Sequence, residues 1–62
     1  MNGISMLARE LQDKINDTID ELEGANNRIG IGALTMEQTE KNLETIRQLE
    51  ALMAQIDLFK KL

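Results

Sequence analysis

Carboxylates are the only abundant groups in this sequence that could carry out chemistry. Its 62 residues include 11 Asp and Glu but no His and no Cys. Imidazole and thiolate, which serve as bases, nucleophiles and zinc ligands in many sites, are therefore missing. Carboxylates alone could hold a hard cation, or could act as an acid and base where two of them converge in a cleft. Any catalytic or metal site would have to be built from clustered acids.

The densest acidic run lies in the first half of the chain and consists of Asp13, Asp17, Asp20, Glu21 and Glu23. Several of these residues are three or four positions apart, so on a helix they would be surface neighbours. The run lacks the Asp-x-Asp-x-Asp-Gly order of a calcium-binding loop. A hairpin of two helices would also offer no concave pocket. We therefore expect a solvated face, with no catalytic residue, no metal and no cofactor, in a protein that is not an enzyme.

The central segment around Gly30-Ile31-Gly32 could suggest a phosphate-binding loop. No strand pattern precedes it and no Gly-Lys-Ser/Thr follows, so we interpret it as a turn between helices, at about residues 30–35. The turn is unusually apolar because it contains Ile31, Ala33 and Leu34. We expect these three residues to close the end of the core. The alternative is that they form part of a docking surface.

Charge and hydropathy exclude two classes of partner. The net charge is −4, and the seven Lys and Arg residues are scattered, so a basic surface for nucleic acid is not expected. No apolar run approaches the roughly 20 residues of a membrane span, and Met1-Asn2-Gly3 does not begin a signal peptide. We expect no membrane insertion. The absence of Cys fits a cytoplasmic location.

The flanking stretches have the composition of helices, since helix-forming residues dominate and Pro is absent. The first predicted helix covers residues of about 4–29, with Asn2 or Ser5 as its N-cap. Its apolar positions repeat every seven residues in two rows: Met1, Ala8, Ile15, Leu22 and Ile29, and Ile4, Leu11, Thr18 and Ala25. With Leu7 and Ile19 they span an arc of about 120°, which one neighbouring helix can cover. Gly30 would be the left-handed cap; the alternative is an end at Gly24.

The second predicted helix covers residues of about 36–61. It begins at Thr35-Met36-Glu37-Gln38, which matches a capping box. Pairs spaced i,i+4, such as Glu37 with Lys41 and Asp57 with Lys61, would add a few tenths of a kcal/mol each. The chain is thus predicted to be an all-α, single-domain antiparallel hairpin of two helices, resembling a coiled coil.

The apolar face of the second helix is much wider than that of the first. It spreads over roughly 220° at 100° per residue, which is more than one neighbouring helix can cover. We therefore expect the first helix to be saturated by its neighbour, and the second helix to offer free surface to a partner. The residues predicted to bind that partner are Leu49, Leu52, Met53, Ile56 and Phe59. The hairpin would then complete a four-helix bundle, by dimerisation or by accepting a helix of another protein.

This layout resembles a known family. A short, acidic, Cys-free hairpin with a Gly-containing turn, a Thr-Met-Glu-Gln-Thr helix start and an apolar stretch from Leu49 to Phe59 is similar to the small E-type cytoplasmic chaperones of bacterial type III secretion needle subunits. The resemblance covers most of the chain in layout and includes no diagnostic motif. It implies a protein that helps a partner chaperone keep the needle subunit monomeric, and that docks through the five residues named above.

Two function classes follow. The favoured one is a non-enzymatic protein-interaction module, whose partner is a helix or a second copy of the chain. The alternative is a small phage or plasmid regulator that inhibits a target by binding or mimicry, with its acidic first helix presented to a basic surface. Salt would weaken binding through the acidic helix and would hardly change docking through the apolar face.

Overall fold

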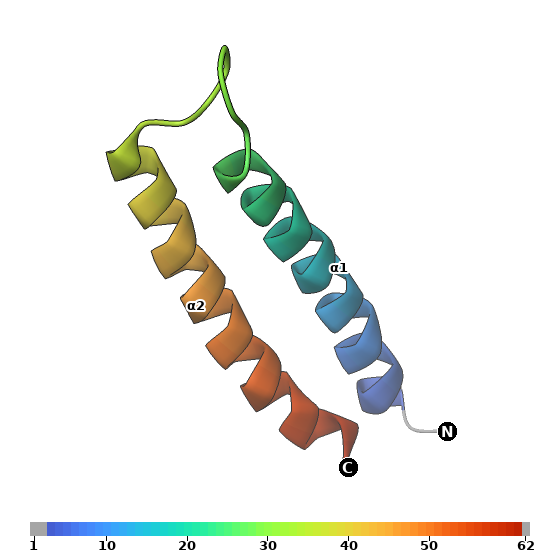
Figure 1. The fold of residues 1–62 in the computed structure, drawn as a ribbon. Helices are drawn as coiled ribbons and strands as arrows, with labels where there is room; N and C mark the ends of the chain where they lie inside the picture. Colours follow the sequence, from blue (N-terminus) through green and yellow to red (C-terminus); the bar gives the residue numbers. More distant parts are fainter. Residues whose placement is uncertain (1–2, 62) are drawn as a thin grey trace.

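Two long helices lie side by side in the computed structural model, which describes residues 3–61 (Figure 1). Helix α1 is Gly3–Asn26 and helix α2 is Met36–Lys60. The helices run in opposite directions, so the first turn of α1 and the last turn of α2 lie at the same end of the hairpin, opposite the connecting loop. We call this the open end. The predicted all-α hairpin is confirmed.

The start of α2 is fixed by the capping box. The backbone N–H of Gln38 donates to Thr35 Oγ1 at 3.1 Å, and the backbone N–H of Thr35 donates to Gln38 Oε1 at 3.0 Å. These two bonds satisfy donors that the first turn of a helix leaves open. The helix begins at Met36 as predicted and ends at Lys60, one residue before the predicted end.

The end of α1 differs from the prediction. The helix continues through Gly24, which excludes the earlier stop, but it ends at Asn26 and not near Ile29. Asn26 turns its side chain to α2, where its amide donates to Thr39 O at 3.5 Å and accepts from Asn42 Nδ2 at 3.0 Å. Gly30 does have a positive φ of 75°, but it lies four residues beyond the helix and belongs to the loop.

The predicted N-caps of α1 have separate outcomes. Ser5 is not a cap, because it lies inside the first turn and its hydroxyl donates to Lys60 O at 3.4 Å. Asn2, like Met1, lies outside the described residues.

The loop does not close the core as expected. Ala33 N–H donates to Gly30 O at 3.1 Å, and Gly32 has a φ of 92°, which suits the third position of a type II turn. Ile31 sits at the tip of this turn and is fully exposed, as Ile29 nearly is. Ala33 is exposed too, and only Leu34 is half-buried. The tight turn projects away from the helices, so its side chains cannot reach the seam between them.

The core is a single seam between the helices. Among residues 3–61, five apolar residues are buried, and three half-buried ones pack against them: Ala8, Ile15, Ile19, Ile46 and Ile56, with Leu22, Leu49 and Met53. The Cα atoms span 48 × 16 × 9 Å, so the hairpin is one helix thick. A layer of this thickness leaves both of its long sides open to solvent, and these sides are where partners could bind.

Polar contacts fix the register of the helices near both ends. Gln12 is buried in the seam, where its amide donates to Met53 O at 3.1 Å and to Asp57 Oδ1 at 2.8 Å. Lys60 Nζ donates to Gln12 Oε1 at 2.9 Å. At the loop end, Asn26 and Asn42 form the second contact. A shift of one helix by one turn would leave Gln12 buried without partners, which is costly.

Candidate protein-interaction surface

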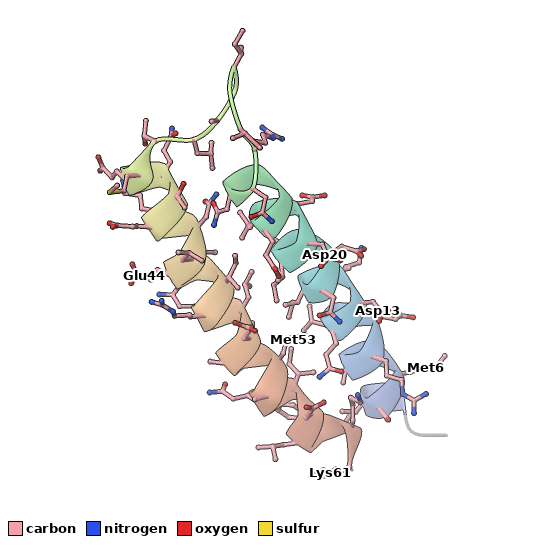
Figure 2. All side chains as sticks on the ribbon, viewed as in Figure 1. Met6, Asp13, Asp20, Glu44, Met53 and Lys61 are labelled. Carbon is pink, nitrogen blue, oxygen red and sulfur yellow. The ribbon has the colours of Figure 1, made fainter. Side chains whose placement is uncertain are left out.

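The five residues predicted to bind a partner divide into two groups. Leu49, Met53 and Ile56 pack against α1 in the seam. Leu52 and Phe59 lie on the edge of α2 and are 42% and 52% exposed. Figure 2 shows the Met53 side chain directed into the space between the helices. Much of the wide apolar face of α2 is therefore used inside the hairpin, and its free part is narrower than the sequence suggested.

Helix α1 also contributes exposed apolar surface, which corrects the prediction that its face is saturated. Ile4, Leu7 and Leu11 are all about half exposed or more, with Leu7 at 66%. The seam of α1 runs through Ala8 and Gln12, which places these three residues on one flank of the contact line. A stripe of about 120° can be covered by one helix only if that helix lies over its centre. Here α2 lies to one side of it.

The exposed apolar residues of both helices meet at the open end. An open groove of about 220 Å³ is lined by Ile4, Leu7, Ala8, Leu11, Ile56 and Phe59. Leu52 lies one turn before Ile56 and two turns before Phe59, so it extends the same surface along α2. We call the long side of the hairpin that carries this groove the apolar side. In the part of the chain that the structure describes, no Asp, Glu, Lys or Arg lines the groove.

The opposite long side is acidic. Its shallow groove is lined by residues that include four acids, Asp20 and Glu23 of α1 and Glu50 and Asp57 of α2. Ile19 and Met53 of the seam also line this groove, whereas Ala8 and Ile56 of the seam line the groove on the apolar side. The described residues that line one groove do not line the other. We call this the acidic side. The sequence did not indicate Glu50 and Asp57 as part of an acidic surface, because they lie on the other helix.

Asp57 is the acid with the most specific surroundings. The hydrogen bond from Gln12, and then the hydrogen bond and the positive charge of Lys60, hold the pKa of the Asp57 carboxyl below its ordinary value, against an opposing effect of desolvation. Lys60 Nζ lies 3.4 Å from Asp57 Oδ1, so the acid pairs with Lys60 and not with the predicted Lys61. The predicted pair of Glu37 with Lys41 is present at 3.4 Å. Asp57 thus has a structural role at the end of the seam.

The other acids show no arrangement that suggests chemistry. Within residues 3–61, no group of three or more Asp and Glu side chains is placed to hold a metal ion. The predicted acidic run from Asp13 to Glu23 is exposed throughout, apart from Ile15, Ile19 and Leu22 between the acids.

Among the exposed apolar residues that line neither groove, two lie next to groove residues in the chain. Met6 is 50% exposed, and Figure 2 shows its side chain on the outer surface of α1, away from α2. Leu58 is 64% exposed. It follows Asp57 and precedes Phe59, and a step of about 100° per residue places it outward on α2. These residues are chain neighbours of Leu7 and Phe59 with similar exposure, so they serve as matched controls.

The part of the chain that the structure describes contains no helix long and apolar enough to cross a membrane. No protein-family model, curated protein or solved structure matches this chain.

Proposed function

We propose that this hairpin is a non-enzymatic protein-interaction module that binds an amphipathic helix along its apolar side. The observation that carries the proposal is the uncharged groove at the open end, to which both helices contribute large exposed apolar residues. An amphipathic helix binds such a groove through apolar residues at positions i, i+3, i+4 and i+7. Phe59 is the proposed anchor, because a large aromatic side chain at the edge of an apolar groove is a frequent hot spot.

The need for a partner is also supported by the size of the core. No described side chain is fully buried, and the seam contains only five buried apolar residues. A domain of this length buries only about 60% of its unfolded surface and is marginally stable unless something else contributes. The chain has no Cys for disulfides. Covering the apolar side would add the missing burial, at about 1.5–3 kcal/mol for each Leu, Ile or Phe that becomes fully buried.

The resemblance to the type III secretion chaperones gives this module a concrete setting. In that setting the hairpin is a co-chaperone that helps keep the needle subunit, or the partner chaperone of that subunit, soluble before export. Support for this proposal comes from the shared layout and from the apolar side. Co-expression with a needle subunit tests it: the proposal expects a soluble complex with the wild-type chain and an insoluble needle subunit with Phe59→Asp.

A synthetic amphipathic helix tests the general function without knowledge of the natural partner. We suggest a labelled peptide of Leu, Ala, Glu and Lys with zero net charge, and fluorescence anisotropy as the readout. Leu7→Asp should weaken peptide binding at least tenfold, because it places a charge in an apolar groove. Met6→Asp, its neighbour on the outer surface, should leave binding within about twofold. Equal loss in both variants, or no binding to the wild-type chain, would contradict the function.

The acidic side supports a second candidate, an acidic regulator that binds a basic surface of its target. Asp20, Glu23, Glu50 and Asp57 bring four carboxylates to one side of the hairpin. Binding through this side should weaken steeply with ionic strength, whereas docking on the apolar side should not. Glu23→Gln and Glu50→Gln would weaken the former and leave the latter unchanged.

A further inference from the structure

We infer that the occupant of the apolar side is a second copy of this chain, so that two hairpins stack into a four-helix bundle. This inference rests on the proposed function and names the partner. Its first support is surface area. A compact monomer of 7.0 kDa is expected to expose about 4000 Å², whereas the hairpin exposes 4996 Å². The excess of about 1000 Å² is close to the roughly 800 Å² that each partner buries in a stable interface.

The second support is the distribution of charge. Next to the seam on the apolar side, one heptad row of each helix runs along the hairpin: Ile4, Leu11, Thr18 and Ala25 on α1, and Gln38, Thr45, Leu52 and Phe59 on α2. Neither row contains a charged residue. The row of Leu7, farther from the seam, continues with the charged residues Lys14 and Glu21. The net charge of −4 on each copy opposes dimerisation unless the charged surfaces are kept apart. Stacking the apolar sides directs the four carboxylates of each acidic side outward, to opposite surfaces of the bundle.

The two threonines in these rows are compatible with burial. The hydroxyl of Thr18 donates to Lys14 O at 3.0 Å, and the hydroxyl of Thr45 donates to Lys41 O at 3.0 Å. Both donors are thus already satisfied within their own helices, so a second copy can cover them without leaving a lone buried donor. The middle of the apolar side can therefore enter the interface along with the groove.

The area and the position of the groove together set the arrangement of the two copies. Burial near 1000 Å² on each copy requires overlap along most of the 48 Å hairpin, and the groove lies at the open end. Both conditions are met when the open ends coincide and a two-fold axis runs along the helices. Helix α1 of one copy then packs on α2 of the other, and every neighbouring pair of helices is antiparallel.

Sedimentation equilibrium of the whole chain tests the inference, over a concentration series from micromolar upward. The expected result is a monomer–dimer equilibrium. Phe59→Asp and Leu7→Asp should each weaken dimerisation at least about 30-fold, as for a hot-spot residue. Leu58→Asp and Met6→Asp should leave it within about twofold. A wild-type chain that stays monomeric throughout, or control variants that lose dimerisation equally, would overturn the inference.

Two further measurements keep the test decisive if a variant unfolds. The melting temperature of a dimer rises with protein concentration, and circular dichroism of the wild-type chain measures this.

The chain has no Cys, so mixing Leu11→Cys with Leu52→Cys should give a disulfide-linked dimer in higher yield than either variant alone. Equal yield from Leu11→Cys alone would exclude the aligned stack. A monomeric chain that still binds the synthetic helix through Leu7 would refute self-association and leave the proposed function standing.

Discussion

The two long sides of the hairpin share one seam but differ in chemistry. The apolar side carries Leu7, Leu11 and Phe59 around a groove without charge, and the acidic side carries carboxylates from both helices. Each side is formed by both helices, so neither groove belongs to one helix alone. The apolar arc of α2 is wide because α2 serves the seam and one flank together. The width of an arc on one helix therefore does not tell which helix has free surface.

The largest expected effect is a loss of stability when seam residues next to the apolar side and next to the acidic side are truncated. Ile56 is buried and lines the groove of the apolar side. Met53 is half-buried and lines the groove of the acidic side. Ile56→Ala should lower the free energy of unfolding by about 3 kcal/mol, and Met53→Ala by about half of that. Urea titration followed by circular dichroism, at one protein concentration, measures both. A larger loss for Met53→Ala would mean that the packing between the helices is stabilised mainly by the seam residues next to the acidic side.

The next effect concerns the buried amide of Gln12. Gln12→Ala removes its hydrogen bonds to Met53 O and Asp57 and leaves Lys60 without an acceptor there. The loss should be about 1–2 kcal/mol in the free energy of unfolding. Gln48→Ala is the matched control, because Gln48 is exposed on α2, and it should change stability by less than about 0.5 kcal/mol. Equal effects of the two substitutions would show that the buried network does not fix the register.

The smallest effect is a pH dependence carried by Asp57. Its pKa is lowered in the folded state, so its contribution to stability is present above about pH 4 and is lost as the pH falls through the folded pKa. The difference in unfolding free energy between the wild-type chain and Asp57→Asn should be largest at neutral pH and vanish in acid. A difference that grows on acidification would contradict the pairing with Gln12 and Lys60.

Local signals in the sequence predicted local structure well. The capping box at Thr35 predicted the start of α2 to the residue, because its two hydrogen bonds involve only residues 35 and 38. The end of α1 was not predictable in this way. The last helical residue, Asn26, contacts Asn42, and these two residues are far apart in the sequence. Gly30 has the predicted left-handed backbone conformation, but it lies in the loop and does not cap the helix. A glycine with a positive φ occurs in loops as well as at helix ends.

The exposed apolar surface was predicted in part. Leu52 and Phe59 were identified from the width of the apolar arc, and both are exposed. Ile4 and Leu11 were assigned to a covered stripe, because the spacing of residues along one helix does not say over which edge the neighbour lies. Gln12 gave no signal, since its burial depends on Asp57 and Lys60 at the other end of the chain.

The central claim is that the apolar side, and not the acidic side, is where this hairpin associates. Amide chemical shifts followed through a dilution series would test it most directly, residue by residue, at constant pH and salt. We expect concentration-dependent shifts at Ile4, Leu7, Leu11, Leu52 and Phe59, and unchanged shifts at Asp20, Glu23 and Glu50. Shifts that gather at those three acids, or a spectrum that does not depend on concentration, would contradict it.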